Sequence, residues 1–123
     1  MTPKQSFLIG ILKDGEEYAG ILLGKNGAPD YHLILLPGQA NDVTWQKAKE
    51  FSAKAGGELP TPREQALLFA NLKEQFEKRY YWSNEQHASN SESAWVQDFY
   101  DGYQDCSLKD DTYRARAVRR LEI

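Results

Sequence analysis

The sequence predicts a single α+β domain that spans residues 1–123. Short apolar runs separated by turn residues fill residues 7–37 and return over residues 80–121, which indicates strands in both parts of the chain. Between them, residues 42–72 follow helical periodicity. The predicted order is therefore three strands, two helices and four strands, with the two helices packed on antiparallel sheets.

Residues 1–30 are predicted to form an N-terminal β-hairpin. The apolar runs FLIGIL and YAGILLG flank the turn dipeptide Asp14-Gly15, a pattern that favours a hairpin. A second turn follows in GKNGAPD, which is rich in Gly, Asn and Pro. Residues 31–37 are nearly all apolar and predict a buried strand. The stretch 38–42 is predicted as a loop.

The first predicted helix covers residues 42–55. Either Asp42 or Thr44 is expected to cap its start, and Gly56 follows its last turn. The helical spacing is carried by apolar and small residues, namely Trp45, Ala48, Phe51, Ser52 and Ala55.

The second predicted helix begins at a capping box. Thr61 is expected to be the N-cap, Pro62 the first helical residue and Glu64 the third, whose side chain returns to the Thr61 amide. Residues 59–65 are therefore interpreted as scaffold, and apolar residues at helical spacing continue the helix to about Leu72.

The last third of the chain returns to strands. A short aromatic strand at 80–83 is followed by a predicted ten-residue polar loop, 84–93. The segments AWVQDF and YQDCSL flank the turn at Asp101-Gly102 and predict a hairpin. A final strand is predicted in YRARAVRRL. Among the aromatic residues, we expect one largely buried cluster formed by Trp82, Trp95 and Phe99.

Four arginines lie within seven residues near the C-terminal end, namely Arg114, Arg116, Arg119 and Arg120. They suit either an anion-binding stripe or ion pairs with nearby carboxylates. The second interpretation is favoured because the region is not net basic. The expected partners are Asp98, Asp101, Asp105, Asp110 and Asp111.

Composition excludes several function classes. The net charge of −3 argues against a general nucleic-acid binder, and the longest apolar runs are too short for membrane insertion. Cys106 is the single cysteine, so no internal disulfide forms. We therefore expect synthesis in a reducing cytoplasm, and later association with a virion stays open.

A set of motifs in residues 31–123 resembles the Lcl C-terminal domain family, a group of C-type-lectin-like domains in phage, prophage and bacterial proteins. The motifs are Leu59-Pro60-Thr61, Tyr81-Trp82-Ser83, Ala94-Trp95 with Asp98-Phe99, and Arg116-Ala117-Val118-Arg119. The chain is most similar to short stand-alone phage members of that family. The resemblance implies a C-type-lectin-like fold with a loop-rich face, and it implies no reaction.

The predicted function is that of a non-catalytic binding module of phage or prophage origin, with a protein or glycan partner and no cofactor or metal. Loops on a rigid frame suit binding, and the predicted binding residues are Asn84, Glu85, His87, Asn90, Tyr100 and Tyr103. Apolar runs in residues 7–23 make a homo-oligomer conceivable.

Three alternatives stay open at this point. One is an intracellular phage accessory factor that binds a host or defence protein. Another is a hydrolase that uses Ser83 or His87, although no Gly-x-Ser-x-Gly motif is present. The third is calcium binding by oxygen atoms of the polar loop, from Asn84, Glu85, Asn90 and Glu92.

Overall fold

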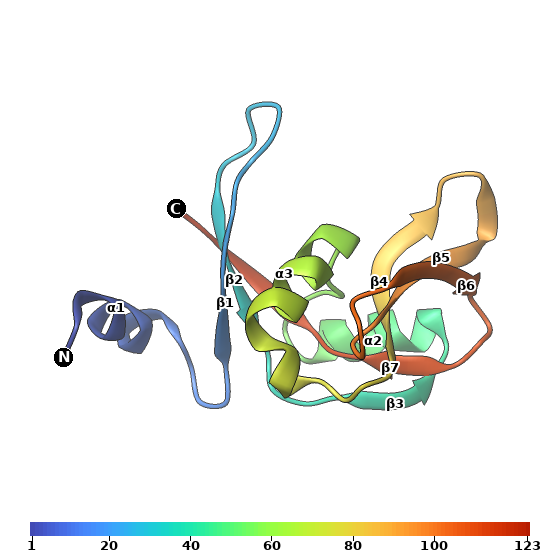
Figure 1. Cartoon of the computed structure of the whole chain (residues 1–123), viewed down its shortest axis with the longest axis horizontal. Helices are drawn as coiled ribbons and strands as arrows, with labels where there is room; N and C mark the ends of the chain where they lie inside the picture. The colour runs from blue at the N-terminus through green and yellow to red at the C-terminus, as the bar shows by residue number, and fades with distance from the viewer.

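A computed structural model describes all residues, 1–123, and shows an α+β fold with two sheets (Figure 1). The helices are α1 (Pro3–Ile11), α2 (Trp45–Lys54), α3 (Pro62–Leu72) and the short 3-10 helix η1 (Lys73–Gln75). The strands are β1 (Glu17–Leu22), β2 (Tyr31–Leu35), β3 (Ala40–Val43), β4 (Tyr80–His87), β5 (Asn90–Asp98), β6 (Gln104–Leu108), β7 (Tyr113–Ala115) and β8 (Val118–Glu122). None of the helices is long and apolar enough to cross a membrane.

The strands form two sheets, which lie on either side of α3 (Figure 1). The three-stranded sheet has the order β1-β2-β8, and the five-stranded sheet has the order β3-β7-β4-β5-β6. All pairings are antiparallel except the single parallel pair between β4 and β7. Figure 1 shows α3 between the two sheets, α1 at one end of the molecule and the β4–β5 hairpin at the other.

The predicted N-terminal hairpin is wrong in its first half. Residues 3–11 form helix α1, because Thr2 caps the Gln5 amide while the Gln5 side chain accepts a hydrogen bond from the Thr2 amide. The turn at Gly15 therefore joins a helix to a strand. The hairpin that does form pairs β1 with β2 around residues 24–30.

Both central helices are confirmed, together with their caps. Thr44 is the N-cap of α2 and accepts from the Lys47 amide. Thr61 accepts from the Glu64 amide at 3.0 Å, and the Glu64 carboxylate accepts from the Thr61 amide at 2.8 Å. The predicted loop at 38–42 instead contains β3, which pairs with β7.

The predicted polar loop at 84–93 is also wrong. These residues extend β4 and β5 into a hairpin with a tight turn at Ala88 and Ser89. The register shifts between Trp82 and His87, so a bulge lets the polar segment keep its backbone pairing. Polarity alone does not exclude a strand whose faces meet solvent. The β5–β6 hairpin around Asp101-Gly102 is confirmed.

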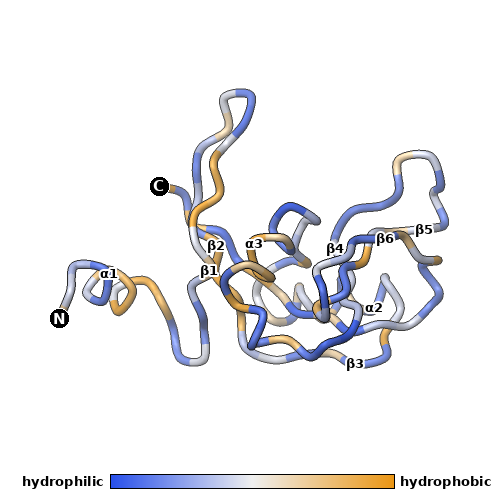
Figure 2. Tube along the Cα trace, viewed as in Figure 1, coloured by the Kyte–Doolittle hydropathy of each residue, from blue (hydrophilic) through white to orange (hydrophobic).

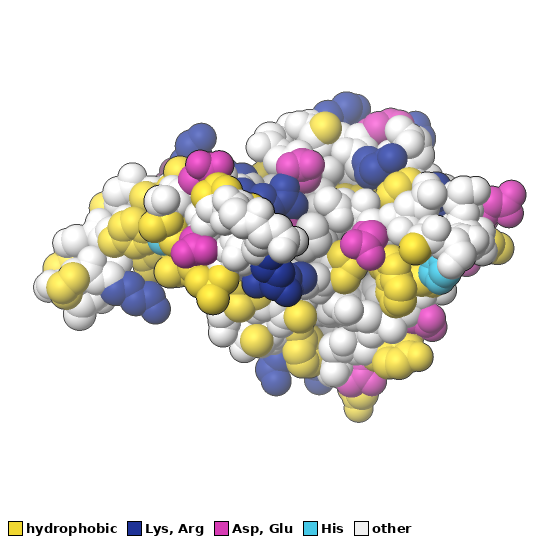
Figure 3. Space-filling model, turned by 90° about the horizontal axis from the view of Figure 1, so that it is seen from above, with side chains coloured by type: hydrophobic (Ala, Val, Ile, Leu, Met, Phe, Trp, Pro, Cys, Tyr) yellow, Lys and Arg dark blue, Asp and Glu magenta, His cyan; other side chains and the backbone are white.

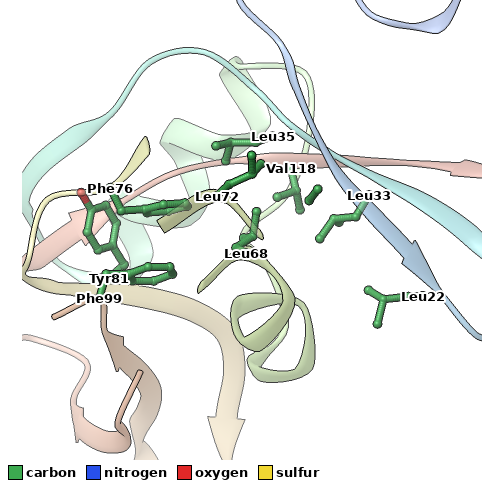
Figure 4. Packing of buried hydrophobic residues seen from close by; sticks show 10 residues of the cluster. Leu22, Leu33, Leu35, Leu68, Leu72, Phe76, Tyr81, Phe99 and Val118 are labelled. Atoms are coloured by element: carbon green, nitrogen blue, oxygen red, sulfur yellow. The ribbon is translucent and has the colours of Figure 1, made fainter. Parts of the chain in front are cut away.

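The larger core cluster joins α3 to both sheets. Leu33 and Leu35 of β2 meet Leu68 of α3, and the aromatic part contains Phe76, which stacks on Phe99 at 4.0 Å between ring centroids (Figure 4). Because these side chains come from segments far apart in the sequence, burying them fixes the position of α3 between the sheets.

The second core cluster lies under α2 and corrects the predicted aromatic cluster. Trp82 is fully buried there, and its Nε1 donates to the Val43 carbonyl at 2.8 Å. Phe99 belongs to the other cluster, and Trp95 is only half-buried on the opposite face of β5. The alternation of strand side chains separates Trp95 from Val96, which packs beside Trp82.

The C-terminal arginines form ion pairs, but with glutamates rather than with the expected aspartates. Arg114 pairs with Glu77, Arg119 with Glu16, and Arg120 with Glu58 and Glu64. Arg116 is buried and donates to the carbonyls of Leu36 and Gln75. The predicted single strand breaks at residues 116–117, so β7 and β8 join different sheets and meet carboxylates of other elements.

Candidate functional site

The six predicted binding residues occupy two separate places. Four of them, Asn84, Glu85, His87 and Asn90, lie on the β4–β5 hairpin. Tyr100 and Tyr103 are strongly exposed at the β5–β6 turn, which follows the other end of β5. Since β5 is nine residues long, a rise of about 3.3 Å per residue puts roughly 25 Å between its ends. The residues therefore do not form one compact surface.

One side of the hairpin carries a half-exposed aromatic stack. The His87 ring lies nearly parallel to the Trp95 indole, with 6.0 Å between centroids and an interplanar angle of 15°. Trp95 pairs with Cys106 of β6, and Ser93 pairs with the exposed Leu108. Side chains that are paired or two residues apart share a face, so Trp95, Cys106 and Leu108 form an apolar and aromatic strip on this side of the hairpin. The hairpin is otherwise mostly hydrophilic (Figure 2).

Cys106 contributes bulk rather than reactivity to this strip. Burial raises the pKa of the Cys106 thiol, and the negative charges of Asp105 and Glu85 raise it further. A thiol whose pKa is raised stays protonated at neutral pH and is a poor nucleophile.

The other side of the hairpin borders a cationic depression that the sequence prediction missed. Trp45, the first residue of α2, forms its floor, and the ammonium groups of Lys49 and Lys109 lie 3.9 and 4.6 Å from the indole centroid. Lys109 also donates to Gln86 of β4 at 2.6 Å. The depression measures about 550 Å³, and Asp110 is also among the residues that line it. The helical spacing of Trp45 and Lys49 was visible in the sequence, but the distant Lys109 was not.

The two asparagines differ in role. Asn84 borders a smaller depression of about 190 Å³ beside α2, together with Lys49, Ser52 and Glu58. Asn90 holds the hairpin turn, because its side chain accepts from the Glu92 amide and donates to Ser93 Oγ. Asn84 is therefore available to a ligand from the α2 side, whereas the side-chain hydrogen bonds of Asn90 are used within the hairpin.

The residues considered for catalysis form no relay. Ser83 is fully buried, and its Oγ accepts from the Glu85 amide. His87 Nδ1 accepts from the Ser89 amide, and His32 Nδ1 is bonded to Tyr18 Oη at 2.8 Å on the three-stranded sheet. Neither histidine is hydrogen-bonded to Ser83. No group of three or more His, Cys, Asp or Glu side chains is arranged to hold a metal ion.

A buried ion pair between Glu64 of α3 and Arg120 of β8 joins the helix to the three-stranded sheet. The Glu64 carboxylate, which has no exposed surface, accepts from Arg120 at 2.7 and 2.8 Å and from Tyr31 Oη at 2.7 Å. Burial raises the pKa of Glu64, but the hydrogen bonds from Arg120, the Thr61 amide and Tyr31 outweigh it, so the pKa lies below its ordinary value. Burial and the neighbouring Glu64 raise the pKa of Tyr31 to about 12.

No protein-family model matches the chain, and no curated protein matches it. The resemblance to the Lcl C-terminal domain family therefore stays an expectation that rests on the quoted motifs. The α+β class is established by the structure itself. Function has to be argued from the surfaces of this chain.

Proposed function

We propose that this protein is a non-catalytic binding module that recognises a protein or glycan through the β4–β5 hairpin and its two flanks. The observation that carries the proposal is the half-exposed stack of His87 on Trp95. Aromatic rings with one apolar face and a polar edge suit contacts to proteins and to sugar rings.

The hairpin grows out of a rigid frame, which supports a binding role. Gln65 of α3 donates to the carbonyls of Tyr81 and Trp82 at 3.2 Å each. Gln97 donates to the Gln65 carbonyl, and Gln104 donates to Gln97 Oε1 at 2.7 Å. These buried bonds fix the bases of β4, β5 and β6 to α3, so the tip is held in a defined place with little cost of ordering on binding.

The chemistry of the two flanks suggests how a partner is oriented. An apolar or ring-shaped group fits the strip at Trp95, while the ammonium groups of Lys49 and Lys109 favour a carboxylate or another anionic group beside them. A single partner that contacts both flanks would enclose the hairpin between its two contact regions. The buried position of Ser83 supports a binding role over the hydrolase alternative.

The phage or prophage origin and the C-type-lectin-like character belong to the same proposal. Their support is the ordered set of motifs, above all Leu59-Pro60-Thr61 and Tyr81-Trp82-Ser83. A virion attachment role and an intracellular accessory role both use the hairpin, and the source of the captured partner distinguishes them.

Two matched variants test the proposal. Glu85→Ala with His87→Ala changes the hairpin, and Tyr100→Ala with Tyr103→Ala changes the turn at the other end of β5. Both pairs lie at the surface, so each should leave stability within about 1 kcal/mol of wild type. We expect the hairpin variant to lose capture of a partner from host lysate, phage particles or a glycan array, and the turn variant to retain it.

The outcomes of the capture experiment distinguish three hypotheses: a binding site on the hairpin, a binding site at the turn, and an enzyme. Equal capture by wild type and the hairpin variant would remove the hairpin from consideration. Loss with the turn variant alone would move the site to Tyr100 and Tyr103. Hydrolytic turnover that disappears on changing Ser83 or His87 would replace the binding module by an enzyme.

A further inference from the structure

Exposed hydrophobic side chains concentrate at the end of the molecule that the hairpin does not occupy. Of the nine large hydrophobic residues with exposed side chains, six belong to α1, the β1 end and the C-terminus, namely Met1, Phe7, Ile9, Ile21, Leu23 and Ile123. Figure 3 shows hydrophobic side chains gathered at that end. Scattered exposed hydrophobic residues are ordinary, but a gathering of this kind marks an interaction surface.

The strand register assigns three of these residues, Ile21, Leu23 and Ile123, to one face of the three-stranded sheet. Ile21 pairs with His32, and His32 pairs with Leu121. Side chains two residues further along a strand share that face, which adds Leu23 and Ile123. The opposite face carries Leu33 and Leu35 and packs on α3. We call this side of the β1-β2-β8 sheet, which α1 covers in part, together with α1, the N-terminal face.

Helix α1 covers only part of the N-terminal face. Phe7 contacts the His32 ring at 4.9 Å and the Tyr18 ring at 6.3 Å between centroids. No side chain of α1 is buried, although the helix has a complete capping box. Ile9 of the helix is therefore exposed to solvent beside the sheet face. Leaving apolar surface in water is unfavourable.

The area of this surface approaches what one partner contributes to a stable dimer. An aromatic side chain buries about 150–250 Å² and an aliphatic one less, so the exposed fractions of the six residues, 41–86%, together amount to an area on the order of several hundred Å². A specific interface buries about 800 Å² on each partner. Met1, Gln5, Leu8 and Ile9 border an open, shallow part of this surface.

We propose that the N-terminal face binds a second copy of this chain in a two-fold dimer. A two-fold contact uses the same patch twice, and this patch offers both parts that such a contact needs, the projecting Ile9 helix and the flat strand surface at Ile21 and Leu23. The β1 edge of the sheet is not free to pair with another strand, because α3 side chains occupy it. Asn71 donates to the Ala19 carbonyl at 2.6 Å, and Arg63 donates to the Leu23 carbonyl at 3.0 Å.

The dimer adds to the proposed function without depending on it. Figure 1 places α1 and the β4–β5 hairpin at opposite ends of the molecule. A dimer joined at the α1 ends therefore carries two hairpins that point away from the contact, which permits bivalent attachment.

The experiment is a mass measurement in solution, by light scattering or sedimentation, on wild type and charged variants. Wild type should have twice the chain mass of 14.1 kDa. The single variants Ile21→Glu and Leu23→Glu replace exposed side chains and should have the chain mass while they keep the circular-dichroism spectrum of the folded protein. The matched control, Tyr100→Glu with Tyr103→Glu, changes exposed aromatic residues elsewhere and should stay dimeric.

A monomeric wild type over the whole accessible concentration range would overturn the dimer. A dimer that survives both charged variants would show that the contact lies on another face. A folded monomer of Ile21→Glu together with a dimeric control supports the N-terminal face, and partner capture by that monomer would show that assembly and binding are separate.

Discussion

Replacing Glu64 with alanine is expected to destabilise the fold by about 3–5 kcal/mol, the cost of breaking a buried ion pair from one side. The substitution leaves the Arg120 guanidinium without its buried partner and removes the acceptor of Tyr31 Oη. It also removes the side chain that caps the Thr61 amide. Urea denaturation followed by circular dichroism measures the loss.

Glu58 provides a matched control because it pairs with the same arginine from an exposed position. An exposed ion pair contributes about 0–1 kcal/mol, so Glu58→Ala should change the denaturation midpoint little. Equal effects of the two substitutions would show that burial of Glu64 is not what stabilises the junction of α3 and β8.

The pH dependence of the same pair has a defined sign. The folded state lowers the pKa of Glu64, so the carboxylate stabilises the fold above its unfolded pKa, about 4.3 for glutamate, and this stabilisation is lost as the pH falls through the folded value. The stability difference between wild type and Glu64→Gln should therefore be largest near neutral pH and shrink below about pH 4.

Replacing Trp82 with alanine is expected to cost about 3–5 kcal/mol, as for other large side chains removed from a packed core. Trp82 has no exposed surface, its Nε1 donates to the Val43 carbonyl, and its ring meets Tyr113 edge-on at 5.1 Å between centroids. The cavity would lie in the cluster between α2 and the five-stranded sheet. Chemical denaturation of the purified variant measures the effect.

Trp95→Ala is the comparison for Trp82→Ala, because Trp95 lies on the other face of β5 and is half-exposed. We expect a smaller loss of stability, since part of its ring is already in water. Losses of the same size at both positions, or a loss below about 1 kcal/mol at Trp82, would contradict the assignment of Trp82 to the core and Trp95 to the surface.

Local signals in the sequence predicted the central helices well and could have predicted α1. Thr61, Pro62 and Glu64 form the capping box that begins α3, and Thr2, Pro3 and Gln5 repeat its pattern. The apolar run FLIGIL by itself predicts a strand, because a short apolar run fits either a strand or a helix. The capping box formed by Thr2 and Gln5 favours the helix.

Signals that depend on distant partners could not be read from the sequence. The arginine partners Glu16, Glu64 and Glu77 lie on elements brought together only by the two sheets. The polar hairpin was missed because its bulge lets hydrophilic residues pair without an apolar face. The depression at Trp45 likewise requires Lys109 from a remote turn.

The indole N–H resonances of the three tryptophans test the proposed binding surface directly when the captured partner is added to nitrogen-15-labelled protein. Those of Trp45 and Trp82 report on buried N–H groups that donate to backbone carbonyls, whereas Trp95 lies half-exposed beside His87. Binding at the hairpin should shift the Trp95 resonance and the amides of residues 84–90, with Trp82 unchanged. Shifts confined to residues 100–103, with Trp95 unchanged, would contradict the proposed site.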